Sequence, residues 1–120
     1  MRIRVLVVED TLDTRQLLEM YLTMEGFDVV TAIDGIDGIS KAVSESPDVI
    51  VTDINMPRLD GVEMIKQLRA KDLFRSLKVI AMTAYGSGPA REASEAGADL
   101  VLRKPILFDS IAETIRKLVA

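Results

Sequence analysis

The chain has 120 residues, 48% hydrophobic and 28% charged, a length and composition that suit one globular domain and exclude a disordered chain. Its 19 acidic and 15 basic residues give a net charge of −4, which argues against nucleic acid or an anionic membrane as a direct partner. The chain contains neither cysteine nor histidine, so any chemistry must use Asp, Glu, Lys, Ser, Thr or Tyr. Its apolar runs are too short for a signal peptide or a membrane span, which predicts a cytoplasmic protein.

Short apolar runs alternate along the chain with segments whose apolar residues recur at helical spacing. The first pair is a strand at 5–8 and a helix at 13–25, which Gly26 is expected to end in a left-handed conformation. Further strands are predicted at 28–32, 49–53, 79–82 and 100–102, and further helices at 36–45, 61–70, 89–96 and 108–119. This alternation with short connections predicts an α/β fold, in which a parallel sheet carries helices on both faces.

The turn into the second predicted helix consists of Asp34 and Gly35. Ile36, Ile39, Ala42 and Val43 are predicted to lie on the apolar face of this helix. Pro47 stops the helix, because proline cannot continue the pattern of backbone hydrogen bonds.

The third predicted strand, 49–53, consists of apolar and β-branched residues until it reaches Asp53. A run without polar alternation indicates a strand that is buried on both faces of a parallel sheet. An unpaired carboxylate at the end of such a strand is unfavourable, so Asp53 needs a partner or a function. Taken alone, Asp53 could also mark only the point where the strand gives way to a loop.

Polar residues with matching chemistry follow the other predicted strands: Glu9 and Asp10 the first, Thr83 the fourth and Lys104 the fifth. If these strands and the third are neighbours, their side chains converge at the carboxyl edge of the sheet, where such folds bind ligands. Carboxylates about 4 Å apart repel by about 4 kcal/mol per pair at an effective dielectric constant of about 20, so they need a cation. Oxygen ligands alone suit Mg²⁺. With a lysine and a hydroxyl beside it, Asp53 has the surroundings of a nucleophile in phosphoryl transfer.

Each of these residues also has a purely structural interpretation. Glu9 and Asp10 could form an acidic cap for the first helix, and Thr83 could simply end a strand. Lys104 could be a solvated surface side chain, and Pro105 an ordinary turn residue. Their joint occurrence at the ends of neighbouring strands favours the functional interpretation.

From end to end the chain resembles the receiver domain of two-component response regulators, and residues 1–120 are interpreted as a single receiver domain. The resemblance implies a CheY-like, doubly wound sheet of five parallel strands, with flavodoxin-like topology and strand order 2-1-3-4-5. Each matching motif is weak alone, whereas their combination is specific. The motifs are Val7-Val8-Glu9-Asp10, Asp53-Ile54-Asn55-Met56-Pro57, Asp60-Gly61, Met82-Thr83-Ala84 and Arg103-Lys104-Pro105.

The resemblance assigns the chemistry to four of these residues. Asp53 is expected to accept a phosphoryl group from a phosphohistidine of a sensor histidine kinase or a histidine phosphotransfer protein. Glu9 and Asp10 are expected to bind Mg²⁺ together with Asp53, helped by the backbone carbonyl of Asn55, and Mn²⁺ is expected to substitute. The absence of histidine from this chain fits a phosphodonor on another protein.

The resemblance also implies a switch. Thr83 and the adjacent Ala84 are expected to move toward the phosphoryl group, and Lys104 is expected to form an ion pair with it. The bond between Lys104 and Pro105 is expected to be cis. The movement would alter the surface formed by the fourth helix, fifth strand and fifth helix, where a downstream partner, an output domain or a second, phosphorylated copy would dock.

This sequence departs from the family where an aromatic residue usually lies on the fifth strand, because Val101 occupies that position. Tyr85, two residues after Thr83, is a candidate modulator of water access to the acyl phosphate. The expected protein is a signalling domain that assists its own phosphorylation and dephosphorylation, and not an enzyme. Both a stand-alone regulator and a piece of a longer chain fit the sequence.

Three other functions were considered. A phosphatase of the haloacid-dehalogenase kind would need an acid at the position of Asn55 and a cap domain. A flavodoxin-like module would need a phosphate-binding loop after the first strand, where Glu9 and Asp10 would repel FMN. A receiver-shaped protein that docks partners without phosphorylation would not need the acidic and lysine positions that this chain retains.

Overall fold

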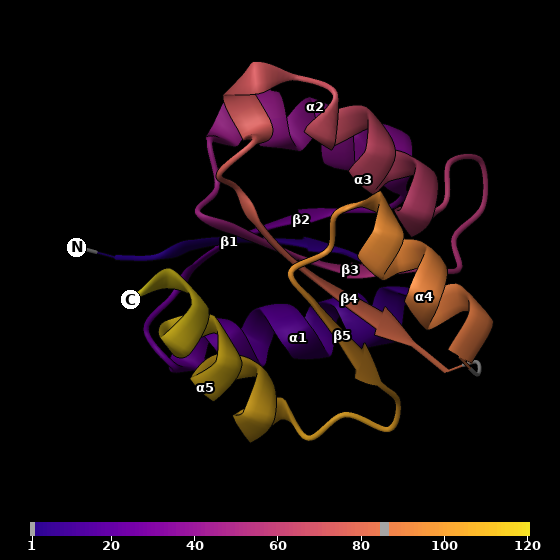
Figure 1. Ribbon diagram of the computed structural model, residues 1–120. Helices are drawn as coiled ribbons and strands as arrows, with labels where there is room; N and C mark the ends of the chain where they lie inside the picture. The colour runs from indigo at the N-terminus through magenta and orange to yellow at the C-terminus, as the bar shows by residue number, and fades with distance from the viewer. Residues whose placement is uncertain (1, 85–86) are drawn as a thin grey trace.

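The computed structural model describes residues 2–84 and 87–120, which form a five-stranded sheet between two layers of helices (Figure 1). Strands and helices alternate as the sequence predicts, with one additional 3₁₀ helix before the fourth strand. The elements are β1 (Arg4–Val8), α1 (Leu12–Met24), β2 (Asp28–Ala32), α2 (Gly35–Glu45), β3 (Val49–Asp53), α3 (Gly61–Arg69), η1 (Asp72–Phe74), β4 (Lys78–Thr83), α4 (Ser87–Ala96), β5 (Leu100–Arg103) and α5 (Phe108–Val119).

All neighbouring strands in the sheet are parallel, and their order is β2-β1-β3-β4-β5. The predicted fold class and strand order are therefore confirmed. The order in which strands are added to the sheet reverses at β1, because β2 lies on one side of β1 and β3 on the other. In open parallel sheets this reversal opens a crevice at the carboxyl ends of the strands, so it fixes where a site can form.

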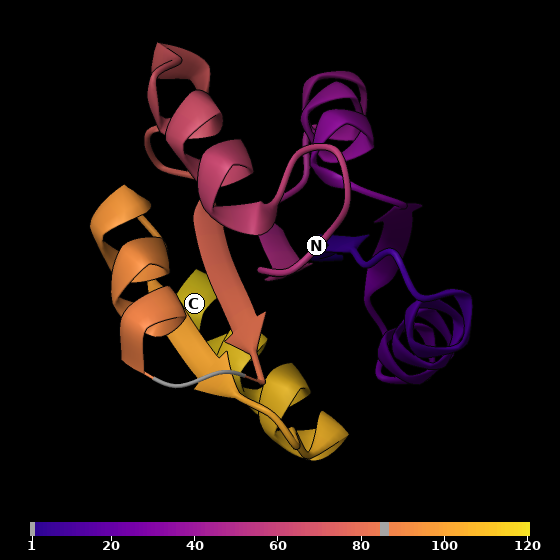
Figure 2. The same cartoon turned by 90° about the vertical axis from the view of Figure 1, so that its right-hand side faces the viewer.

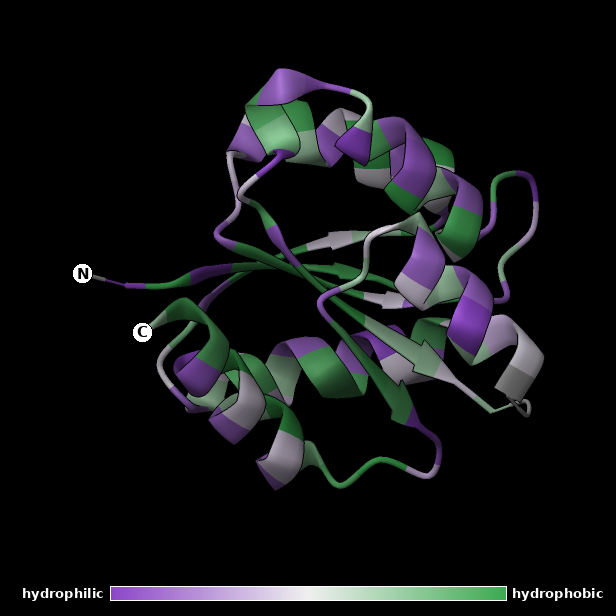
Figure 3. Cartoon of the chain, in the orientation of Figure 1, coloured by the Kyte–Doolittle hydropathy of each residue, from purple (hydrophilic) through white to green (hydrophobic). Residues whose placement is uncertain are grey.

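Helices α1 and α5 cover one face of the sheet, and α2, α3 and α4 cover the other (Figures 1 and 2). Strand side chains alternate between the two layers, because successive residues of a strand point to opposite faces. Val5 and Val7 pack toward α1 and α5, whereas Leu6 and Val8 pack toward the other helices. Figure 3 shows the hydrophobic residues concentrated along the central strands, as expected for a sheet buried on both faces.

Helix α1 ends as the sequence predicts, since Gly26 has a φ of 95° and the Phe27 amide reaches back to the Leu22 carbonyl at 3.1 Å. The predicted apolar face of α2 was wrong in part. Ile36 and Val43 are 56% and 54% exposed, and the buried residues of this helix are Gly35, Gly38 and Ala42. Small residues form the contact face because α2 lies close to its neighbours.

Candidate metal centre

The order of the strands brings the predicted site residues to one edge of the sheet. Glu9 follows β1, Asp53 ends β3, Thr83 ends β4 and Lys104 follows β5, and these four strands are neighbours. The register aligns their ends, because Asp53 lies opposite Met82 in the next strand. The condition on which the sequence argument depended is therefore met.

Three carboxylates form a cluster at this edge: Glu9, Asp10 and Asp53 each offer an oxygen within 4.8 Å of the others. Glu9 is 1% exposed and Asp53 8% exposed, whereas Asp10 is open to solvent. Carboxylates packed at this distance repel one another strongly when charged. A divalent cation that binds oxygen is the group that such a cluster can accommodate.

Among the described residues, Lys104 is the cation paired with Asp53. The Lys104 ammonium donates to Asp53 Oδ2 at 3.0 Å, and the Asn55 amide donates to Asp53 Oδ1 at 3.3 Å. Both carboxylate oxygens of Asp53 therefore accept a hydrogen bond at the carboxyl end of β3. One lysine balances the charge of only one of the two inner carboxylates.

Among the described residues, no cationic side chain forms an ion pair with Glu9. Burial, followed by the negative charge of Asp53, raises the pKa of Glu9 from its ordinary value to about 7, and the charge of Lys104 opposes this shift. Within the described residues, Glu9 Oε2 is a buried side-chain oxygen that accepts no hydrogen bond. A buried acceptor without a donor is unfavourable, and a cation bound between Glu9 and Asp53 would satisfy it. The residues present therefore fit a Mg²⁺ ion.

Backbone hydrogen bonds fix the segments that carry these side chains. The Glu9 amide donates to the Ala32 carbonyl at 3.0 Å, and the Arg15 guanidinium donates to the Glu9 carbonyl at 2.9 Å. After β5, the Lys104 amide donates to the Thr83 carbonyl at 2.8 Å. These bonds hold the loops at the same level of the sheet edge.

The remaining predicted residues lie around this cluster. Thr83 is buried at the end of β4, Ala84 is exposed next to it, and the peptide bond between Lys104 and Pro105 is cis. Val101 pairs with Ala81 in the sheet and packs against the core beneath α3 and α4. Tyr85 lies outside the described residues.

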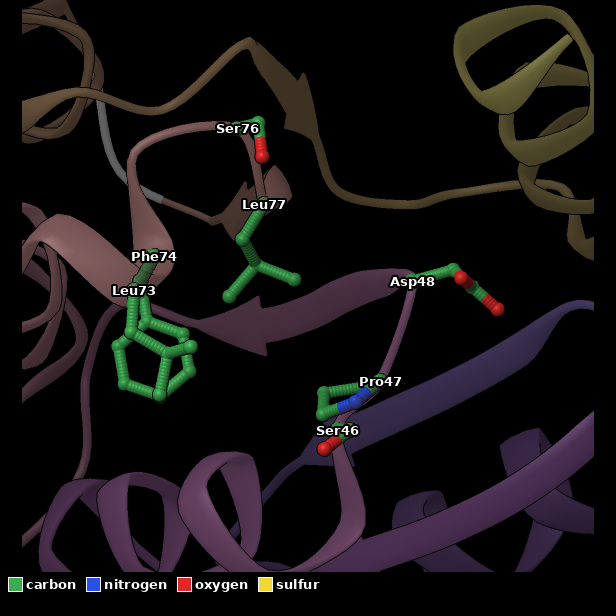
Figure 4. A pocket seen from close by; sticks show the side chains of 7 residues that line it. All are labelled: Ser46, Pro47, Asp48, Leu73, Phe74, Ser76 and Leu77. Carbon is green, nitrogen blue, oxygen red and sulfur yellow. The ribbon is translucent and has the colours of Figure 1, made fainter.

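Two hollows lie at opposite edges of the sheet. One, of about 180 Å³, adjoins the site between α1 and the segment that leads into α5. Its lining residues are Thr14, Leu18, Met82, Lys104, Pro105, Ile106, Phe108 and Ile111. The other, of about 210 Å³, lies at the amino ends of β3 and β4 and contains no part of the acidic cluster. Figure 4 shows its lining, Ser46, Pro47 and Asp48 from the turn before β3 and Leu73, Phe74, Ser76 and Leu77 from the segment before β4.

The sequence argument missed two residues near the site. Asp34, interpreted only as part of a turn, is a buried carboxylate that forms an ion pair with Arg58. Arg58 belongs to the loop between β3 and α3, 24 positions away in the chain. The turn signal at Asp34 and Gly35 was visible, but nothing local indicated that it contacts this loop.

The strand order and the acidic edge define a flavodoxin-like α/β domain with a candidate site for a divalent cation at its switch point. Within that class, the family described as "Response regulator receiver domain" matches residues 5–116. The chain belongs to this family, and it is the receiver domain of a two-component response regulator.

Individual relatives agree with this assignment. The transcriptional regulatory protein PrrA of Mycobacterium tuberculosis is 42% identical over 117 residues, which are 97% of this chain and 49% of PrrA. The response regulator MprA of the same species is 37% identical over 120 residues, 99% of this chain and 51% of MprA. The chain therefore spans about half the length of these curated relatives.

Solved structures agree as well. The chemotaxis response regulator CheY4 of Vibrio cholerae superposes with a TM-score of 0.91 at 29% identity, over 98% of this chain and 99% of that one. Among the described residues, no helix is both long and apolar enough to cross a membrane.

Proposed function

We propose that Asp53 is the phosphoryl acceptor of a two-component signalling switch. The observation that carries this proposal is the position of its carboxylate, which has oxygens of Glu9 and Asp10 within 4.8 Å and the Lys104 ammonium at 3.0 Å. A nucleophilic carboxylate is useful in phosphoryl transfer when nearby cations neutralise the charge that accumulates on the phosphoryl oxygens. The domain, residues 1–120, acts as one receiver unit.

Glu9, Asp10 and Asp53 would hold the divalent ion, with the backbone carbonyl of Asn55 as a further ligand. When bound, Mg²⁺ supplies charge neutralisation at the transferring phosphoryl group. Mn²⁺, which accepts the same oxygen ligands, would substitute. Glu9 and Asp10 thus serve the reaction as ligands.

In the transfer, a carboxylate oxygen of Asp53 forms a bond to phosphorus as the bond from phosphorus to the donor nitrogen breaks. The leaving imidazole keeps the electron pair of that bond and takes up a proton. Lys104, now paired with Asp53 at 3.0 Å, exchanges its partner for a phosphoryl oxygen. The donor is a phosphohistidine of a sensor histidine kinase or a histidine phosphotransfer protein, and a donor on another protein fits the absence of histidine from this chain.

The phosphorylated state differs from the unphosphorylated one by a larger negative charge at Asp53. Thr83 donates its hydroxyl proton in a hydrogen bond to a phosphoryl oxygen, and Ala84 follows. This movement alters the surface of α4, β5 and α5, which binds a downstream protein, an output domain or a second copy. Water then hydrolyses the acyl phosphate, so the domain returns to its resting state without acting on a separate substrate, and Tyr85 modulates this step.

The same proposal places the protein in the cytoplasm, where the sensor kinase donates its phosphoryl group. The acidic net charge of −4 supports protein partners for this domain and not nucleic acid or a membrane surface. Any further contact, such as binding to DNA, would belong to an output domain.

Incubation with acetyl phosphate and Mg²⁺ tests the proposal. The protein is expected to gain the mass of one phosphoryl group, because acetyl phosphate, like phosphohistidine, is an activated phosphoryl donor. Asp53→Asn is expected to abolish this gain, and Asp72→Asn, an exposed acid in η1, is expected to leave it unchanged. Labelling that persists in Asp53→Asn would show that the acceptor is another residue.

A further inference from the structure

The turn between β2 and α2 contacts both segments that carry the candidate metal ligands. The Ala32 carbonyl accepts a hydrogen bond from the Glu9 amide at 3.0 Å. Three residues later, the Gly35 amide donates to the Leu59 carbonyl, also at 3.0 Å. Leu59 belongs to the loop between β3 and α3, which passes beside the start of α2 (Figure 2). None of the residues 32–35 belongs to the acidic cluster.

The carboxylate of Asp34 takes part in this contact through both of its oxygens. Asp34 Oδ1 accepts from the Asp37 amide at 2.9 Å, which caps α2, and Asp34 Oδ2 accepts from the Arg58 guanidinium. The side chain is 1% exposed, so its charge depends on these donors. The Asp37 amide, with Arg58, lowers the pKa of Asp34. Asp34 therefore connects the rigid start of α2 to the loop.

Gly35 allows the loop to lie against the helix. A Cβ atom at this position would lie 2.4 Å from the Leu59 carbonyl oxygen, so any side chain would force the loop away. Arg58 itself has a φ of 67°, a left-handed conformation that a non-glycine residue adopts only when its surroundings hold it there. The ion pair with Asp34 and the contact at Gly35 supply those surroundings.

The same loop carries Asn55, three residues before Arg58. Its amide donates to Asp53 Oδ1 at 3.3 Å, so the start of the loop is bonded to the candidate nucleophile. Groups that orient the ligands of a metal ion affect its affinity although they do not touch it. A loop that is free to move would lose the ligand geometry at Asn55.

We propose that Asp34 is a positioning residue for the metal centre, acting through Arg58 to hold the loop that carries Asn55. This inference rests on the proposed function, because it concerns the same divalent ion. Asp34 and Arg58 are not ligands in this scheme. They fix the conformation in which the loop and the acidic cluster bind the ion together.

The direction in which Mg²⁺ affinity changes when Arg58 is removed distinguishes a positioning role from a purely electrostatic one. The positive charge of Arg58, on the loop that follows Asp53, would repel Mg²⁺ at the acidic cluster, so loss of this charge alone would not weaken Mg²⁺ binding and would tend to strengthen it. Loss of its positioning role would weaken binding. The side chain of Arg58 is 62% exposed, so Arg58→Gln is expected to fold.

The experiment is a calorimetric titration of the full chain with Mg²⁺, compared among variants. We expect Arg58→Gln to bind Mg²⁺ about tenfold more weakly than the wild type. Arg58→Lys, which keeps the charge, is expected to recover most of the affinity. The double variant Asp34→Asn with Arg58→Gln leaves the net charge unchanged and is expected to show the same loss. At saturating Mg²⁺, Arg58→Gln is expected to approach the wild-type extent of labelling by acetyl phosphate.

Arg75→Gln is the matched control, because Arg75 forms an exposed ion pair with Asp72, next to Phe74 of the hollow at the amino edge. It is expected to keep wild-type affinity. Equal or tighter binding of Mg²⁺ by Arg58→Gln, or an equal loss in Arg75→Gln, would overturn the inference while leaving the proposed function intact. A wild-type protein that takes up no Mg²⁺ would overturn both. Thermal unfolding in EDTA checks that the variants are folded.

Discussion

The two edges of the sheet differ in how their charged side chains are paired. At the amino edge, the Arg4 guanidinium donates to Asp28 at 2.8 Å and to the Glu45 carbonyl at 2.7 Å. Arg69 on the same edge donates to four backbone carbonyls and to Asp99. Each guanidinium has several acceptors close by. The hydrogen bonds of this edge join elements that are distant in the chain.

Within the acidic cluster at the carboxyl edge, the two buried carboxylates, Glu9 and Asp53, have one lysine beside them. Lys104 pairs with Asp53, while Glu9 Oε2 is left without a hydrogen bond among the described residues. An arrangement of this kind costs stability, because like charges are held together out of water. The side chains of the amino edge therefore stabilise the fold, whereas those of the carboxyl edge are arranged for binding, as expected for a fold whose ligands bind at the carboxyl edge.

Loss of a single cation at the amino edge is expected to lower the stability of the fold strongly. Arg69 donates to the carbonyls of Phe74, Leu77 and Gly97 at 2.6–3.1 Å and to Asp99 at 3.0 Å. Arg69→Met keeps the aliphatic stem and removes these donors, so it is expected to lower the free energy of unfolding by about 3 kcal/mol. Urea denaturation of the metal-free protein measures this.

The matched control is Arg91→Met, because Arg91 forms an exposed ion pair with Glu95 one helical turn away. This substitution is expected to change the free energy of unfolding by less than about 0.5 kcal/mol. A loss in Arg69→Met as small as that in the control would contradict the role given to the amino edge.

At the carboxyl edge, removal of a charge is expected to raise the free energy of unfolding. Glu9→Gln removes a buried charge that faces Asp53, so in EDTA at pH 8 it is expected to raise the free energy of unfolding by about 1 kcal/mol. The same variant is expected to lose the stabilisation that Mg²⁺ gives to the wild type. Asp10→Asn, which alters the exposed member of the cluster, should raise stability less. Destabilisation by Glu9→Gln in EDTA would mean that the carboxylates do not repel one another.

The smallest effect on the chemistry is expected at Val101, which lies on β5 and packs beneath α3 and α4. Val101→Tyr restores the aromatic residue that the family usually has, at a distance from the acidic cluster. Labelling by acetyl phosphate, followed by mass, is expected to be unchanged. Self-association of the phosphorylated protein, measured by light scattering, is expected to differ. A variant that no longer accepts phosphoryl would place Val101 within the site.

The fold followed from sequence because local and global signals agree. The strand ending at Asp53 consists of apolar and β-branched residues, and Gly26 and Pro47 mark the ends of two helices. The acidic edge could be predicted because a parallel sheet aligns the carboxyl ends of its strands, which groups residues that are far apart in the chain. The resemblance to receiver domains supplied the strand order.

The elements that escaped prediction depend on short or distant contacts. The 3₁₀ helix Asp72–Phe74 is too short to show a period, and α4 begins at Ser87 because Pro89 is tolerated within a first helical turn. The ion pair of Asp34 and Arg58 joins two turns across the fold. The sequence around neither residue indicates such a contact.

Calorimetric titration of the metal-free wild-type protein with Mg²⁺ tests the central claim most directly. The cluster of Glu9, Asp10 and Asp53 is expected to bind one ion per chain, and Asp53→Asn is expected to weaken that binding markedly. Absence of uptake by the wild type, or undiminished uptake by Asp53→Asn, would contradict a shared divalent ion at the carboxyl edge.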